Sequence, residues 1–198
     1  MIDNHFRPHL PKLTRKLIRL YRFVGVTPNQ ITILSLFVSF GAAYLVATQS
    51  FLSALALWWL GRLFDGTDGI FARETNQATD FGAFLDILCD MASYSAMVIG
   101  FNFAFPELHF IWMFIIFLYV LCITGALALG SFEDGKPGLK KDNRGLRLAA
   151  GIAEGGETGI AYSAFLLFPG QIHILSLIWS AILIVTVLAR AVLARKEL

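Results

Sequence analysis

Long apolar runs with few charged residues make up most of this chain of 198 residues. Runs of this kind are typical of helices that cross a bilayer, whose hydrocarbon core of about 30 Å is spanned by roughly 20 residues at 1.5 Å per residue. We therefore predict an all-α integral membrane protein with six transmembrane helices. They lie at residues 31–48, 51–64, 81–105, 110–130, 151–168 and 172–189.

The second predicted span, 51–64, is shorter than the others. Its 14 residues cover only about 21 Å of helix, so we expect the helix to continue into the sequence that follows. The third span, 81–105, is long enough to begin in water and end on the other side of the membrane. The sequence between these two spans therefore belongs at one edge of the membrane and dips into its core.

The first 30 residues have a different pattern. From Lys12 to Val24, apolar residues recur at helical spacing and Lys or Arg residues fill the opposite face. This pattern predicts an amphipathic helix on an anionic membrane surface, ended by Gly25 and Pro28. Basic helices also bind nucleic acids, but membrane spans follow this one directly, so we expect no nucleic-acid partner. Residues 1–30 then form a juxtamembrane segment, and 31–198 a six-helix catalytic domain.

Composition supports a membrane protein, and the positions of the charged residues indicate how the chain is oriented in the membrane. The chain is 57% hydrophobic and 15% charged, with a mean hydropathy of +0.67, as expected for a membrane protein. All 16 Lys and Arg residues lie before the first span, at the carboxylate motif (Arg62 and Arg73), between residues 136 and 147, or at the end of the chain. The connections on the opposite side contain none. The positive-inside rule therefore places both termini in the cytoplasm, and we expect a bacterial inner membrane.

Four carboxylates stand out among the apolar residues that surround them. Asp65 and Asp68 are three residues apart, and Asp86 and Asp90 are four apart, so each pair shares one face of its helix. Two carboxylates about 4 Å apart repel by roughly 4 kcal/mol at an effective dielectric constant near 20. If the two helices bring the pairs together, divalent cations that prefer oxygen ligands would offset this repulsion. We expect two ions, Mg²⁺ or Mn²⁺, at the cytoplasmic edge.

The segment from Asp65 to Asp90 also contains a longer pattern. It reads Asp-x-x-Asp-Gly-x-x-Ala-Arg, then eight residues, then Gly-x-x-x-Asp-x-x-x-Asp. This pattern resembles the signature of the CDP-alcohol phosphatidyltransferases, and all eight fixed positions are filled. The resemblance implies six transmembrane helices around a polar cavity open to the cytoplasm, often in a homodimer. It also implies an enzyme of phospholipid biosynthesis, in which the hydroxyl of an acceptor alcohol attacks the phosphate of a CDP-alcohol and releases CMP.

The resemblance implies a role for each motif residue. Asp65, Asp68 and Asp86 match metal ligands, and Asp90 matches a shared ligand that is also the general base. The residues that match contacts to the nucleotide or diphosphate are Gly69, Ala72, Arg73 and Gly82, with Asn29 before the first span as a further candidate.

The sequence says less about the substrates. CDP-diacylglycerol is the simplest donor, because its acyl chains can stay in the bilayer, although another CDP-linked alcohol fits the motif as well. Branches of the family transfer to glycerol phosphate, serine, inositol phosphate or diacylglycerol. Glu154 and Glu157 begin the fifth predicted span, where acidic residues are costly. We predict that they bind an uncharged polyol or an amino alcohol; the alternative is that they only tie this helix to its neighbours.

Two other classes of membrane protein use carboxylates in a similar way. A cation transporter carries them within the membrane, but near the midplane and on broken helices, whereas here they cluster at one edge. A Mg²⁺-dependent prenyltransferase also acts on a diphosphate, but it usually needs more spans than 198 residues supply. Both remain alternatives to the phosphatidyltransferase.

Overall fold

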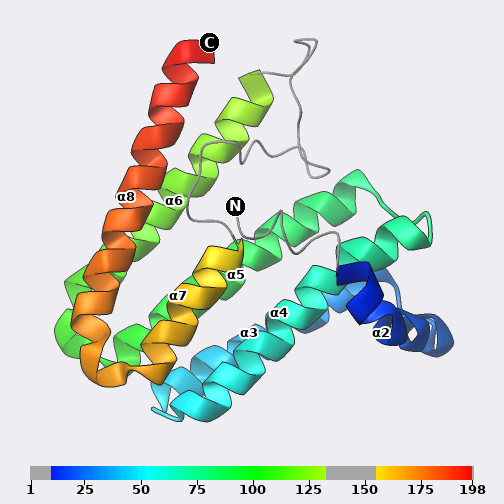
Figure 1. Ribbon diagram of the computed structural model, residues 1–198, viewed down its shortest axis with the longest axis horizontal. Helices are drawn as coiled ribbons and strands as arrows, with labels where there is room; N and C mark the ends of the chain where they lie inside the picture. Colours follow the sequence, from blue (N-terminus) through cyan, green and yellow to red (C-terminus); the bar gives the residue numbers. More distant parts are fainter. Residues whose placement is uncertain (1–9, 133–154, 198) are drawn as a thin grey trace. The chain divides into compact units, whose positions relative to one another are not determined.

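The structure, a computed structural model, describes residues 10–132 and 155–197, and the regular structure in these ranges is helical (Figure 1). The described α-helices are α2 (Leu10–Val24), α3 (Pro28–Ala47), α4 (Phe51–Glu74), α5 (Asp80–Ala104), α6 (His109–Phe132), α7 (Gly155–Leu167) and α8 (Ile172–Glu197). Short 3₁₀ turns, Pro106–Leu108 and Pro169–Gln171, precede α6 and α8. The chain forms two compact units, Met1–Pro106 and Glu107–Leu198.

In the first unit, α3 packs against both α4 and α5. Small residues allow this close approach. A Cβ atom placed on Gly100 of α5 would lie 2.5 Å from the carbonyl oxygen of Ala43 on α3. A Cβ atom on Gly61 of α4 would lie 2.8 Å from the hydroxyl of Ser39. Glycines at helix crossings are common in membrane proteins, where they let two backbones approach closely. They bring α4 and α5 to the same central helix.

The connection between α2 and α3 is fixed by local sequence. Gly25 ends α2 in the left-handed conformation, with φ of +76°, which glycine adopts without strain. Pro28 then occupies the first turn of α3, where its missing N–H costs nothing. The side chain of Thr27 accepts a hydrogen bond from the backbone N–H of Gln30, and the Gln30 side chain accepts one from the backbone N–H of Thr27. The predicted end of the amphipathic helix at Gly25 and Pro28 is confirmed.

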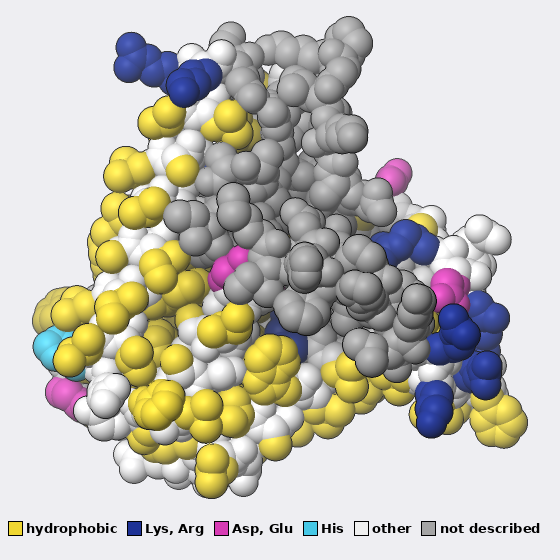
Figure 2. Space-filling model, viewed as in Figure 1, with side chains coloured by type: hydrophobic (Ala, Val, Ile, Leu, Met, Phe, Trp, Pro, Cys, Tyr) yellow, Lys and Arg dark blue, Asp and Glu magenta, His cyan; other side chains and the backbone are white. Residues whose placement is uncertain are grey.

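Helix α2 lies against the C-terminal half of α4. Ile18 and Tyr21 are buried and pack in one cluster with Ile70 and Phe71 of α4. The opposite face of α2 is exposed and basic, as Figure 2 shows at the place where Figure 1 draws this helix. Its exposed basic residues are Arg15, Lys16, Arg19 and Arg22. The predicted amphipathic helix is therefore present.

In the second unit, α8 packs against α6 and α7. A buried hydrogen-bonded group joins the three helices. The hydroxyl of Tyr119 on α6 accepts hydrogen bonds from the hydroxyl of Tyr162 on α7 and from the indole N–H of Trp179 on α8, both 2.9 Å long. The two hydroxyls and the indole N–H are therefore all paired, so these large side chains are buried without leaving an unpaired polar atom.

The helices α3 to α8 occur where the six spans were predicted. Among the described residues, four segments are long and apolar enough to cross a membrane: Pro28–Ala47, Asp80–Ala104, Pro106–Phe132 and Pro169–Lys196. Large hydrophobic side chains also cover much of the visible surface of the helices (Figure 2). The all-helical integral membrane fold is confirmed.

The other two predicted spans, which correspond to α4 and α7, are not among these four segments. Helix α4 continues through the motif to Glu74, as expected, and the charged residues there lower its hydropathy. The described part of α7 has only 13 residues, since the predicted start of this span, residues 151–154, lies outside the described residues. The basic stretch 136–147 lies outside them as well. A count of six crossings therefore stays a prediction.

Candidate functional site

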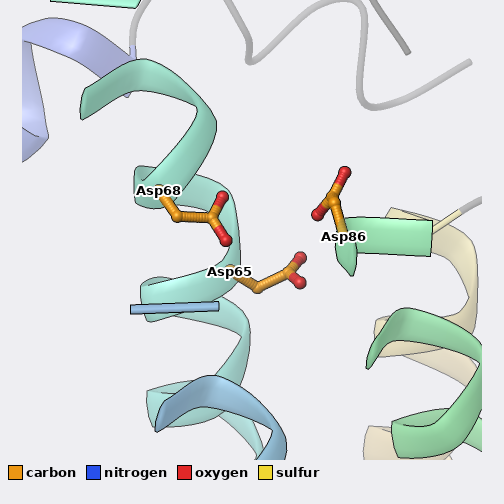
Figure 3. Close-up of side chains that lie close together, drawn as sticks. All are labelled: Asp65, Asp68 and Asp86. Atoms are coloured by element: carbon orange, nitrogen blue, oxygen red, sulfur yellow. The ribbon is translucent and has the colours of Figure 1, made fainter. Parts of the chain in front are cut away.

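Three of the predicted carboxylates meet between α4 and α5. Asp65 and Asp68 lie in the C-terminal half of α4, and Asp86 lies near the start of α5. One carboxylate oxygen from each lies within 4.8 Å of the others. Figure 3 shows the three carboxyl groups facing one another from the two helices. We refer to Asp65, Asp68 and Asp86 as the carboxylate cluster.

The start of α5 is fixed by a helix cap. The hydroxyl of Thr79 accepts a hydrogen bond of 3.0 Å from the backbone N–H of Gly82. This contact satisfies one of the free N–H groups at the helix start. It also fixes where α5 begins, and therefore which of its residues face α4. Asp86 comes one turn after Gly82 on the same helical face.

Asp68 is the most buried member of the cluster, with 5% of its surface exposed. Its carboxylate accepts a hydrogen bond of 2.5 Å from the hydroxyl of Thr32 on α3 and one of 2.5 Å from the backbone N–H of Gly69. These bonds hold the carboxylate in one orientation. Thr32 was not predicted as a site residue. It lies 36 positions from Asp68, and no sequence pattern relates the two.

Asp65 has two oxygens in different surroundings. One accepts a hydrogen bond of 3.3 Å from Arg62, which precedes it by one helical turn. The other is buried and has no hydrogen-bond partner among the described residues. A buried polar atom of this kind costs roughly 1–3 kcal/mol unless a partner is supplied. It lies beside two further carboxylates, so a cation is the partner that the site favours.

The residues of the carboxylate cluster fit a divalent metal ion. They offer only hard oxygen donors, which Mg²⁺ and Mn²⁺ prefer. At 4.8 Å, two full negative charges repel by about 3.5 kcal/mol at an effective dielectric constant near 20. The cluster contains three such pairs. A bound cation would remove this repulsion and satisfy the unpaired oxygen of Asp65.

Asp90, the fourth predicted carboxylate, lies one turn beyond Asp86 on α5 and is paired differently. One of its oxygens accepts a hydrogen bond of 2.7 Å from the Nη1 of Arg62. The same nitrogen also donates to the hydroxyl of Tyr94 at 3.2 Å. The structure thus places Asp90 in an ion pair beside the carboxylate cluster. Its predicted roles as a shared ligand and general base stay predictions.

Four of the residues predicted to contact the nucleotide lie close together in pairs, Gly82 with Asn29 and Gly69 with Arg73. A Cβ atom on Gly82 would lie 3.2 Å from the side-chain oxygen of Asn29, so the start of α5 and the start of α3 touch here. A Cβ atom on Gly69 would lie 3.2 Å from Nη1 of Arg73, one turn later on α4. Ala72, before Arg73, is half-buried. A side chain at either glycine would therefore crowd its neighbour.

Helix α2 also reaches the motif. The hydroxyl of Tyr21 is hydrogen-bonded to the hydroxyl of Thr67, at 3.0 Å, and Thr67 lies between Asp65 and Asp68 on α4. Burial raises the pKa of Tyr21, and the charge of Asp68 raises it further. The phenol therefore stays neutral and keeps its hydrogen bond at physiological pH. The sequence analysis assigned α2 to the membrane surface and missed this contact.

The predicted acceptor-binding residues are described only in part. Glu157 lies in the first turn of α7, in the second unit, and is half-buried. Glu154 lies outside the described residues. Their predicted role in acceptor recognition therefore stays a prediction.

Comparison with known proteins relates most of the chain to one family. The model of the family described as CDP-alcohol phosphatidyltransferase matches residues 25–192. The inner membrane protein YnjF of Escherichia coli is 28% identical over 197 residues, which cover 96% of this chain and 93% of YnjF. The phosphatidylinositol phosphate synthase of Mycobacterium tuberculosis is 36% identical over 95 residues, but these cover only 48% of this chain and 44% of the synthase.

Solved structures show the same fold. The crystal structure of the M. tuberculosis phosphatidylinositol phosphate synthase PgsA1 in complex with manganese and citrate superposes with a TM-score of 0.69 at 22% identity. The match covers 89% of this chain and 86% of PgsA1. The structure of the same synthase with CDP-DAG bound gives a TM-score of 0.66 at 23% identity, with 91% and 92% covered.

Proposed function

Because this chain belongs to the CDP-alcohol phosphatidyltransferase family, we propose that it transfers a phosphatidyl group from CDP-diacylglycerol to an acceptor alcohol and releases CMP. The observation that carries this proposal is the carboxylate cluster, which two motif-bearing helices form at one place. The proposed donor, CDP-diacylglycerol, carries both a charged diphosphate and lipid chains. A group of carboxylates beside membrane helices suits that substrate.

The carboxylate cluster would hold a Mg²⁺ or Mn²⁺ ion. When bound, such an ion neutralises charge on the diphosphate and on the departing phosphate. The oxygen donors, the unpaired oxygen of Asp65 and the manganese in the structure of PgsA1 support this assignment. The sequence analysis expected two ions with Asp90 as a shared ligand. One oxygen of Asp90 accepts a hydrogen bond from Arg62, and its other oxygen could ligate a second ion while this ion pair stays.

The chain's own residues supply binding and proton transfer. We assign Asp90 as the general base, which takes the proton from the acceptor hydroxyl while that oxygen attacks phosphorus. The bond between phosphorus and the CMP oxygen breaks, and CMP leaves with the electron pair. The nucleotide would pack against Gly69 and Gly82, which have no side chain to keep it away. Arg73 and Asn29, which border these glycines, would then contact the nucleotide or diphosphate.

The proposal includes a position in the membrane. The helices α3 to α8 cross the bilayer, both termini lie in the cytoplasm, and the carboxylate cluster faces the cytoplasmic edge. Helix α2 lies on the membrane surface with its basic face toward anionic lipids. The membrane is the bacterial inner membrane, as the name of YnjF states for that relative. The homodimer that the family resemblance implies stays a prediction.

The alternatives from the sequence analysis lose support. A family match over residues 25–192 explains the carboxylates as parts of a phosphatidyltransferase motif. No described feature favours a cation transporter or a prenyltransferase over it.

The test is an assay of CMP release with purified protein, CDP-diacylglycerol and Mn²⁺. The acceptors are glycerol, inositol, serine and ethanolamine, with glycerol phosphate and inositol phosphate as the phosphorylated set. We expect CMP release that depends on both one acceptor and the metal. CMP release without any acceptor, or none with any acceptor, would contradict the proposal. The preferred acceptor also tests the prediction of an uncharged polyol or amino alcohol.

A further inference from the structure

The exposed side of α2 combines positive charge with apolar side chains. Its exposed basic residues are Arg15, Lys16, Arg19 and Arg22. Three large apolar side chains beside them are exposed as well: Leu20 by 52%, Phe23 by 90% and Val24 by 62%. Figure 2 shows hydrophobic and basic side chains next to one another where Figure 1 draws α2. Exposed apolar residues beside Lys and Arg on a helix are typical of contact with a bilayer surface.

The spacing of these residues lets one side of α2 contact headgroups and acyl chains together. Lys16 precedes Leu20 by four positions, and Arg19 precedes Phe23 by four. Each of these basic residues therefore lies one turn before an apolar residue on the same face. Lys and Arg can lay their apolar stems along lipid and keep the charge beside phosphate. Each one near an anionic surface strengthens binding by roughly fivefold, and a neutral surface offers no such gain.

The other side of α2 is packed on the end of α4. Ile18 and Tyr21 lie in one buried cluster with Phe71 of α4. The rings of Tyr21 and Phe71 meet edge to face, with their centroids 5.5 Å apart. Beyond them, Arg22 pairs with Glu74, the last residue of α4, at 3.4 Å. The apolar residues of α2 are thus divided between the protein on one side and the surface on the other.

One hydrogen bond joins α2 to the turn of α4 that carries two members of the carboxylate cluster. Thr67 lies between Asp65 and Asp68 and is 1% exposed. Its hydroxyl donates to backbone carbonyl oxygens of the preceding turn, 2.9 Å away. Because a Thr hydroxyl has one hydrogen, Tyr21 is the donor in the bond of 3.0 Å between the two side chains. The position of α2 therefore bears on the turn that orients Asp65 and Asp68.

We propose that the exposed side of α2 binds an anionic phospholipid surface, and that this binding speeds the transfer reaction by holding the contact between Tyr21 and Thr67. If the packed face of α2 entered the lipid instead, the helix would rotate about its axis and move Lys16 and Arg19 away from the headgroups. An anionic surface therefore favours α2 on α4, since a partner shifts a protein only toward the state that it binds better. This inference rests on the proposed function and adds a lipid dependence to it.

The test compares activity in two membranes: nanodiscs of phosphatidylcholine alone and the same nanodiscs with phosphatidylglycerol added. Donor, acceptor and Mn²⁺ are saturating, so that attraction of the metal to anionic lipid does not contribute. For the wild type we expect phosphatidylglycerol to raise kcat by about fivefold or more, the gain that one additional basic contact supplies. An equal kcat in the two membranes would overturn the proposal.

Charge variants test whether the increase comes from α2. The triple variant Arg15→Gln/Lys16→Gln/Arg19→Gln should lose it. Arg195→Gln/Lys196→Gln is the matched control, because it removes exposed basic residues from the end of α8, and it should keep the increase. A triple variant that keeps the increase, or a control that loses it equally, contradicts the proposal.

Tyr21→Phe tests the link to the motif, because it keeps the ring and removes the hydroxyl. We expect Tyr21→Phe to lose most of the increase, and Tyr21→Phe/Thr67→Val to respond no less than Tyr21→Phe alone, since the two hydroxyls act as one pair. A full increase in Tyr21→Phe would mean that this contact does not carry the effect. Thermal unfolding identifies variants that do not fold, and Thr67→Val takes the place of Tyr21→Phe if that variant is one of them.

A nitroxide label on Leu20→Cys gives a readout that is independent of activity. The native Cys89 and Cys122 are buried, and the unsubstituted protein supplies their background. Phosphatidylglycerol should lower the access of a water-soluble relaxation agent to the label, and the triple charge variant should remove this change. Equal access in both membranes would contradict binding of α2 to the anionic surface. If no CDP-alcohol substrate reacts, the proposed function fails, yet this measurement still tests that binding.

Discussion

Replacing Asp86 by Asn should stabilise the metal-free protein and remove its response to metal. The side chain of Asn has nearly the shape of Asp but no charge, so the change removes two of the three repulsive pairs in the carboxylate cluster. At 4.8 Å, each pair costs between about 0.9 kcal/mol, if water screens it fully, and about 3.5 kcal/mol at an effective dielectric constant near 20. Because Asp86 is half-buried, the screened value is the safer guide. Two pairs then give about 2 kcal/mol.

The measurement is thermal unfolding in detergent, with a chelator and with Mn²⁺. A gain of about 2 kcal/mol corresponds to a rise in Tm of roughly 4–8 °C for a chain of this size. In the wild type, Mn²⁺ at 100 times its Kd should add about 2.7 kcal/mol, and Asp86→Asn should lose most of this gain. Asp80→Asn, an exposed change in the first turn of the same helix, is the matched control.

One result would refute the reasoning. If Asp86→Asn lowers the Tm in chelator and keeps the full Mn²⁺ response, the three carboxylates do not form a repulsive metal site. If Asp80→Asn gives the same rise as Asp86→Asn, the gain belongs to α5 in general and not to the carboxylate cluster.

Three further predictions follow from the fold and the site. Cysteines introduced at the termini and near Lys140 should be labelled only from the cytoplasm and one near Glu107 only from outside; labelling of the termini from opposite sides would exclude six crossings. Gly82→Ala should raise the KM for the CDP-lipid, because its Cβ would crowd Asn29, 3.2 Å away; an unchanged KM would argue against nucleotide binding there. Glu157→Gln should raise the acceptor KM while CDP-lipid binding stays normal; lost stability with unchanged acceptor kinetics would indicate a structural role instead.

The sequence predicted the helices well because their cause is local. A long apolar run in a membrane protein indicates a helix, and all six predicted spans correspond to helices α3 to α8. The end of α2 could be predicted as well, since Gly25 and Pro28 act on their own backbone. The continuation of α4 through the motif followed from the length that a crossing requires.

The carboxylate cluster could be predicted because Asp65 and Asp68 lie one turn apart on α4, and the motif adds Asp86 on the next helix, within 22 positions of Asp65. The side chains that orient it could not be predicted in the same way. Thr32 and Tyr21 reach the motif from other helices, and nothing in the sequence relates them to it. Arg62 was visible one turn before Asp65, but its pairing with Asp90 depends on how α4 and α5 meet.

The most direct test of the account is a single turnover of CDP-diacylglycerol with its preferred acceptor, followed in the wild type and in Asp90→Asn. For the wild type we predict one CMP and one new phospholipid for each CDP-diacylglycerol consumed. For Asp90→Asn we predict a rate lower by about 10²-fold or more, because the proton of the acceptor hydroxyl has no base, while CDP-lipid binding is partly retained. An Asp90→Asn variant that turns over as fast as the wild type at saturating substrate would contradict the assignment of Asp90 as the base.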